Sequence, residues 1–107
     1  MAWVWLVLAG VCEVVWAVGL KLYGFRLSVG SAVTVVMMLL SFYLLSLAMR
    51  HIPLGTAYGV WTGIGAVGAV VYGIARLGEP RDLPRIACIG LIVAGIVGLK
   101  LLTPGSE

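Results

Sequence analysis

The sequence predicts an all-α membrane protein whose chain crosses the bilayer four times. Its 107 residues are 63% hydrophobic and only 10% charged, and the mean hydropathy is +1.18. Soluble domains carry about 25% charged residues. Four apolar stretches, each near the length of about 20 residues that spans a bilayer as a helix, account for most of the chain. We therefore expect one domain, residues 1–107, with four transmembrane helices and no water-soluble domain beside them.

The first helix, expected at about residues 3–20, contains a single charged side chain, Glu13. In a membrane span this carboxylate lies near the hydrocarbon midplane, where it costs several kcal/mol unless it is protonated or paired. Helical spacing places Gly10 and Trp16 on the same face. The alternative is a soluble core helix whose acid reaches solvent or a salt bridge, and the composition argues against it. An acid inside a membrane span predicts a functional site.

The second and third helices are expected at about residues 29–49 and 54–75, separated by a short turn containing Pro53. The segment Gly63–Gly68 matches G-x-G-x-x-G, but no strand precedes it and no βαβ unit fits, so we reject a dinucleotide site. A pair of glycines weakens a helix locally. Gly63 and Gly65 therefore predict a bend in the third helix, which would be useful in a transporter.

The fourth helix, at about residues 84–102, follows a charged loop at residues 76–85. It has almost no polar side chain before Lys100. Small residues repeat along it, and such ladders let membrane helices approach closely. The ladder consists of Gly90, Ala94 and Gly98, with Gly95 beside it. We expect this helix to form a dimer contact rather than to line a pathway.

The sequence favours no enzyme, cofactor or metal site. It contains no nucleophilic triad, P-loop or metal-binding cluster, and Cys12 and Cys88 are best explained as buried structural thiols. The net charge of +3 falls mostly in loops and at helix ends, which suggests anchoring in membrane lipid rather than binding to nucleic acid. What remains is one buried acid with aromatic and hydroxyl side chains, a set suited to binding a cation and a proton in turn.

Four helices make a thin bundle that cannot readily enclose a substrate and alternate its openings. Many transporters use two inverted halves around a site at the midplane. No internal repeat is visible, so the second half would be another copy of the chain, inserted oppositely and bringing a second Glu13. The loop charges favour one orientation instead, because the first and third loops with their helix ends carry five basic residues and the other side two. The five are Lys21, Arg26, Arg76, Arg81 and Arg85, and the two are Arg50 and Lys100.

Motifs spread over nearly the whole chain resemble those of the small multidrug resistance transporters. They are Gly10-x-x-Glu13-x-x-Trp16 ending in Leu20-Lys21, Ser41-Phe42-Tyr43, Pro53-x-Gly55-x-Ala57-Tyr58-x-x-Trp61-x-Gly63-x-Gly65, Glu79-Pro80 with Asp82, and Ala94-Gly95. Trp16 stands where multidrug members usually have glycine. With Gly10 and the run Trp61-Thr62-Gly63-Ile64-Gly65-Ala66, it resembles the guanidinium-exporter subtype.

The resemblance implies an antiparallel, dual-topology homodimer in the bacterial inner (plasma) membrane that exchanges protons for guanidinium and small substituted guanidines. By position, Glu13 of both subunits is the carboxylate for which proton and substrate compete. Trp16 and Ser41 are its hydrogen-bonding neighbours, while Tyr58 and Trp61 line the site. The bend at Gly63 and Gly65 and the dimer contact at Ala94-Gly95 are implied as well.

Two other functions remain open from the sequence. The first is a broad exporter of quaternary ammonium compounds and other drugs. The second, less favoured, is a non-transporting membrane assembly subunit in which Glu13 pairs with a base of a partner. The polar and aromatic lining at Trp16, Ser41, Tyr58 and Trp61 argues against a passive subunit.

Overall fold

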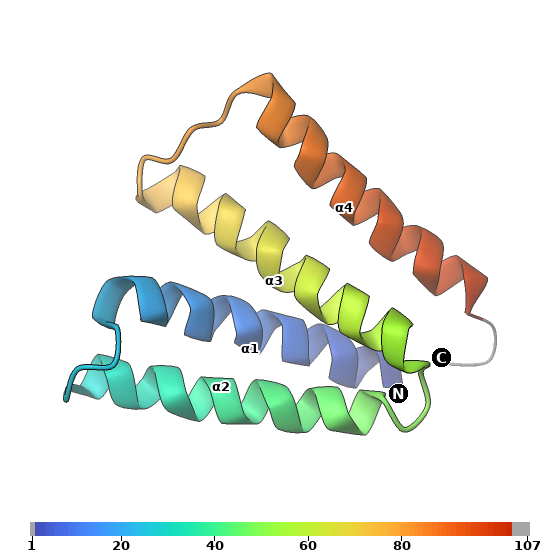
Figure 1. Ribbon diagram of the computed structural model, residues 1–107, viewed down its shortest axis with the longest axis horizontal. Coiled ribbons are helices and arrows are strands. Elements are labelled where there is room, and N and C mark those ends of the chain that lie inside the picture. Colours follow the sequence, from blue (N-terminus) through green and yellow to red (C-terminus); the bar gives the residue numbers. More distant parts are fainter. Residues whose placement is uncertain (1, 104–107) are drawn as a thin grey trace.

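The computed structural model describes residues 2–103, which form four helices joined by short loops (Figure 1). Helix α1 spans Ala2–Tyr23, α2 Val29–Ala48, α3 Leu54–Arg76 and α4 Leu83–Leu102. No strand is present in residues 2–103. Each helix is long and apolar enough to cross a membrane. The predicted all-α class with four spans is therefore confirmed.

The helix ends follow from local chemistry. Helix α1 continues three residues beyond the expected Leu20, because it stops only where Gly24 takes the left-handed φ of 62°. Helix α3 stops in the same way just before Gly78, with φ of 69°. Ser28 is the N-cap of α2, since its hydroxyl accepts a hydrogen bond from the Ser31 amide at 3.1 Å. Pro84 lies in the first turn of α4, where its missing N–H costs nothing.

The four helices form a flat layer in the order α2, α1, α3, α4 (Figure 1). The layer measures 42 × 34 × 16 Å, and a helix with side chains is itself about 10–12 Å across. Helix α1 packs against both α2 and α3, whereas α4 comes within 8 Å, Cα to Cα, of α3 alone. One chain therefore has two broad faces and little depth in which to enclose a ligand.

Glycines set the close approach of α1 to its neighbours. A Cβ added to Gly10 would lie 2.6 Å from Ile64 of α3, and one added to Gly68 of α3 would overlap Val14. On the other side of α1, Gly19 receives Thr34 of α2. Small residues at such positions allow membrane helices to gain van der Waals contact where the hydrophobic effect cannot drive association.

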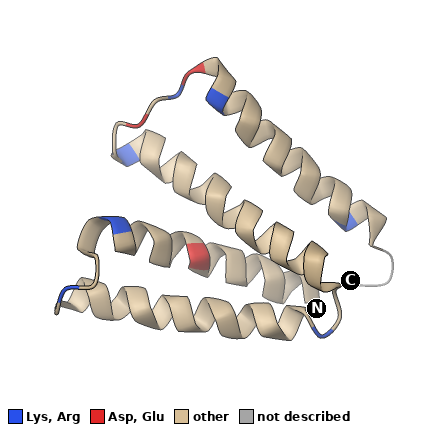
Figure 2. Ribbon diagram, in the orientation of Figure 1, with Lys and Arg blue, Asp and Glu red and all other residues tan. Residues whose placement is uncertain are grey.

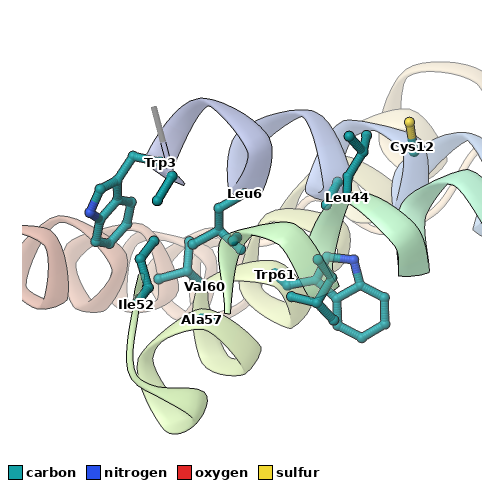
Figure 3. Packing of buried hydrophobic residues seen from close by; sticks show 12 residues of the cluster. Trp3, Leu6, Cys12, Leu44, Ile52, Ala57, Val60 and Trp61 are labelled. Atoms are coloured by element: carbon teal, nitrogen blue, oxygen red, sulfur yellow. The ribbon is translucent and has the colours of Figure 1, made fainter. Parts of the chain in front are cut away.

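Buried apolar side chains pack together near the turn between α2 and α3 (Figure 3). Leu6 of α1, Ile52 of the turn and Val60 of α3 are each at most 2% exposed. Larger apolar side chains on the outer faces of α2 and α4 are exposed, as expected where lipid replaces water. The loops α1–α2 and α3–α4 lie at the same end of the layer, and most Lys and Arg residues lie at helix ends or in loops (Figure 2).

Helix α4 has no buried residue. It contacts α3 through Ile92 and Ile96, whose side chains lie 3.0–3.2 Å from a Cβ built on Gly63. A Cβ added to Gly90, Gly95 or Gly98 would meet nothing within 4 Å. These three glycines of α4 are thus not used for close packing within residues 2–103.

Candidate functional site: an acid without a partner inside a membrane span

Glu13 lies near the middle of α1 (Figure 2) with its carboxyl group directed against Gly65 of α3. A Cβ at position 65 would overlap the carboxyl group, so only glycine leaves room for it there. The Oε1 atom is buried and has no hydrogen-bond partner. No basic side chain in residues 2–103 forms a salt bridge with Glu13 either. The salt bridge found in this part of the chain joins Arg85 and Asp82, which are exposed at the start of α4. A buried carboxyl oxygen left unpaired is costly, which makes Glu13 a candidate functional residue.

Trp16 lies one turn further along α1, on the same face as Glu13. Its indole N–H is buried and also lacks a partner. The resemblance implied that Trp16 would donate a hydrogen bond to Glu13, and this bond is not present in the structure. One unpaired donor and one unpaired acceptor therefore stand one turn apart.

Ser41 braces three helices instead of binding Glu13. Its hydroxyl donates to the backbone carbonyl of Ala9 in α1 at 2.7 Å and accepts from the Trp61 indole N–H of α3 at 2.9 Å. Both bonds are buried, and Ser41 is fully buried. The implied hydrogen bond from Ser41 to Glu13 is thus replaced by two others, because Ala9 and Trp61 satisfy the hydroxyl within the chain.

Aromatic rings from α1, α2 and α3 gather beside this brace. Phe42 lies between Trp16 and Trp61, with ring centroids 6.2 Å and 5.8 Å away. Tyr58 lies 5.6 Å from Trp61 and is 55% exposed. These separations fall in the range that aromatic pairs prefer. Sequence reasoning did not assign Phe42 to the site, although its place beside Ser41 in the motif Ser41-Phe42-Tyr43 was a signal.

The two glycines expected to bend α3 have separate packing roles. Helix α3 is continuous from Leu54 to Arg76. Gly63 accommodates Ile92 and Ile96 of α4, and Gly65 accommodates Glu13 of α1. The bend remains a prediction, whereas the contacts explain why glycine occurs at both positions in this conformation. Gly10, expected to line the site, packs against Ile64.

We expect Ser41→Ala to lower the free energy of unfolding by about 1 kcal/mol, since it leaves the buried Trp61 N–H and the Ala9 carbonyl without their shared partner. Ser46→Ala is the matched control, because the Ser46 hydroxyl is exposed and bonds only to Tyr43 of its own helix. The measurement is SDS-induced unfolding in mixed micelles. Equal stability of the two variants would contradict the bracing role.

Fold and site together define a polytopic membrane protein with a carboxyl group held unpaired inside a transmembrane span. The sequence profile of the family described as "Small Multidrug Resistance protein" matches residues 1–92. The chain belongs to this family, which confirms the resemblance found in the motifs.

Similar proteins share the sequence over nearly its whole length. The chain is 56% identical over 102 residues to a protein of Yersinia pseudotuberculosis named "Guanidinium exporter", covering 94% of this chain and 98% of that one. It is 56% identical over 104 residues to the "Guanidinium exporter" of Escherichia coli K12, and 55% over 104 residues to that of Citrobacter freundii. Both alignments cover 96% of this chain and 99% of the relative. With four apolar helices and bacterial relatives of this kind, the protein is a multi-pass protein of the inner membrane.

Proposed function

We propose that this protein exports guanidinium and small substituted guanidines in exchange for protons, with both ligands competing for Glu13. The observation that carries the proposal is the unpaired Glu13 carboxyl group inside an apolar span. The names of relatives at 55–56% identity supply the cation class. The relatives are named as exporters, in agreement with a transporter rather than an enzyme.

The chemistry of competition follows from the site. A carboxylate without a counter-ion in an apolar span attracts a cation, while the protonated acid is neutral and is cheap to leave empty. Guanidinium is planar, with N–H donors in a fork that matches a carboxylate. Because proton and guanidinium require opposite states of one group, they cannot be bound there together. Competition at a site that opens alternately to the two sides produces antiport.

We further propose that two copies assemble antiparallel, each contributing its Glu13. A single layer 16 Å deep has little depth in which to surround a cation, and the rings of Phe42 and Tyr58 beside the site are exposed in the single chain. A second copy inserted oppositely supplies the missing half and the inverted symmetry common in transporters. The small residues of α4, open in the single chain, are available for the contact.

Proton-coupled guanidinium flux in liposomes tests the function directly. Purified protein in vesicles with a pH-sensitive dye inside should move protons only when guanidinium is added, and at a rate proportional to the protein content. Vesicles without protein provide the blank. Absence of guanidinium-driven proton movement from correctly folded protein would leave the assembly-subunit interpretation in its place.

We expect Gly95→Leu to weaken dimerisation without unfolding the chain, because a Cβ added at position 95 would meet nothing within 4 Å in residues 2–103. Val33→Leu on the lipid-facing side of α2 serves as the control. The measurement is dimer dissociation on dilution in detergent. Orientation is tested separately by labelling cysteines placed at the chain termini from outside intact cells, and complete labelling or complete protection of all molecules would contradict the antiparallel arrangement.

A broader drug exporter is the second candidate, and the aromatic cluster favours it. Exposed rings such as Tyr58 and Phe42 can hold a quaternary ammonium ion through cation–π contact. Such an ion has no N–H, however, so it cannot donate a hydrogen bond to the Glu13 carboxylate. Sites built to hydrogen-bond a substrate reject analogues that lack the donor by large factors.

We therefore expect Trp16→Gly to lose guanidinium transport and gain transport of bulky quaternary ammonium ions. The indole fills space one turn from Glu13, and its free N–H is available to orient the carboxylate. The measurement compares proton movement driven by guanidinium and by tetrapropylammonium, a bulky quaternary ammonium ion without N–H, in both proteins. Equal responses to the two cations in the unmutated protein would overturn the selectivity.

A further inference from the structure

An apolar groove of about 510 Å³ runs between α1, α3 and α4. Val11 and Val15 of α1 form one wall, Val67 of α3 the floor, and Val93 and Val97 of α4 the other wall. Every side chain that lines it is apolar. A polar occupant would lose its hydrogen bonds to water and find none in return. The groove is therefore suited to a hydrocarbon chain.

The groove does not belong to the proposed transport site. Val11 and Val15 lie two residues on either side of Glu13, about 200° around a helix of 3.6 residues per turn. Val14, which also lines the groove, lies about 100° from Glu13, so the groove side of α1 is turned away from the acid without being directly opposite to it. On α4, Gly95 and Gly98 lie at least about 100° around the helix from each of the residues that line the groove, Val93, Ile96 and Val97. A second copy that covers Glu13 and the small residues of α4 leaves the groove facing the bilayer.

A positive charge marks one end of the groove. Lys100 follows Ile96 and Val97 by one turn on the same side of α4, close to the end of the helix. Its ammonium lies 5.0 Å from the ring centroid of Trp3 in α1, so it bridges two helices whose backbones do not otherwise approach. No carboxylate in residues 2–103 forms a salt bridge with it. Near the end of a membrane span, a lysine reaches the headgroup region.

We propose that the groove binds one acyl chain of an anionic phospholipid, with the lipid phosphate on Lys100. The charge at the end of the groove selects the anionic headgroup, as basic sites between transmembrane helices do. The apolar walls then hold the chain by van der Waals contact. Such a lipid fills the space between α1 and α4, and it therefore fixes the angle of α4 to the rest of the subunit. This site is independent of the proposed export of guanidinium.

Native mass spectrometry of the detergent-solubilised protein tests the site with two probes, dioleoyl phosphatidylglycerol and dioleoyl phosphatidylcholine. The unmutated protein should retain phosphatidylglycerol in preference to phosphatidylcholine. Lys100→Gln should weaken binding of phosphatidylglycerol about fivefold, the effect of one basic residue at an anionic surface. Arg26→Gln removes the same charge from an exposed loop and should change little. Equal effects of the two variants would overturn the proposal.

A second pair of variants tests the walls. Val97→Phe fills the groove and should reduce retention of both lipids, while Val36→Phe enlarges an exposed side chain of α2 outside it and should not. Unchanged lipid retention in Val97→Phe would overturn the proposal. Loss of the dimer in the same spectra would mean that a second copy covers the groove, which also refutes it. Because transport is not measured, failure here does not bear on guanidinium export.

Discussion

Glu13→Gln should reduce guanidinium-driven proton movement to that of vesicles without protein while leaving the fold intact. Glutamine has nearly the same shape, so the contact with Gly65 is kept. It cannot carry the negative charge or release a proton. Removing one partner of a buried charge pair costs about 2–5 kcal/mol, which corresponds to about 30-fold or more in cation affinity. Loss of coupling follows independently, because no other acid lies within the four spans of residues 2–103.

The pH dependence of guanidinium binding to the purified protein gives a second readout. As the pH falls, Glu13 takes up a proton, loses its charge and binds guanidinium more weakly. The affinity for guanidinium should therefore rise with pH in the unmutated protein, whereas Glu13→Gln should bind guanidinium weakly at every pH. Glu79→Gln, which makes the same change in the exposed α3–α4 loop, is the control and should retain both transport and pH dependence. Coupled flux in Glu13→Gln at the unmutated rate would refute the assignment of the shared site.

Gly65→Ala should reduce guanidinium transport about 100-fold. The added Cβ overlaps the Glu13 carboxyl group, so either the acid or α3 must move. A misplacement of about 1 Å at a reacting or binding group can cost about 100-fold. Alanine is a better helix former than glycine by about 1 kcal/mol, so a loss of guanidinium transport in Gly65→Ala would not result from a weaker helix.

Gly55→Ala provides the matched control in the same helix, because a Cβ there meets nothing within 4 Å. It should transport like the unmutated protein. Circular dichroism and the dimer fraction in detergent separate a displaced carboxylate from misfolding. If Gly65→Ala and Gly55→Ala were equally active, Gly65 would have no part in positioning Glu13.

The positions of the four spans and the isolated acid followed from the sequence alone. Hydropathy and charge are properties of consecutive residues, and the length of an apolar run decides whether it crosses a bilayer. For the same reason Glu13 was identifiable without a structure, since no other acidic or basic side chain lies near it in α1. The motifs from Gly10 to Gly65 likewise identified the family.

Only the tertiary structure decided which partners these residues have. The family resemblance implied that Ser41 is a hydrogen-bonding neighbour of Glu13, yet its hydroxyl forms hydrogen bonds with Ala9 and Trp61. Gly65, expected to allow a bend in α3, also receives the carboxyl group of Glu13. Such pairings depend on the rotation and register of one helix against another, which are set by side-chain packing across the interface. The periodicity of a single helix gives the face on which a residue lies, but the side chain that meets it belongs to a different helix.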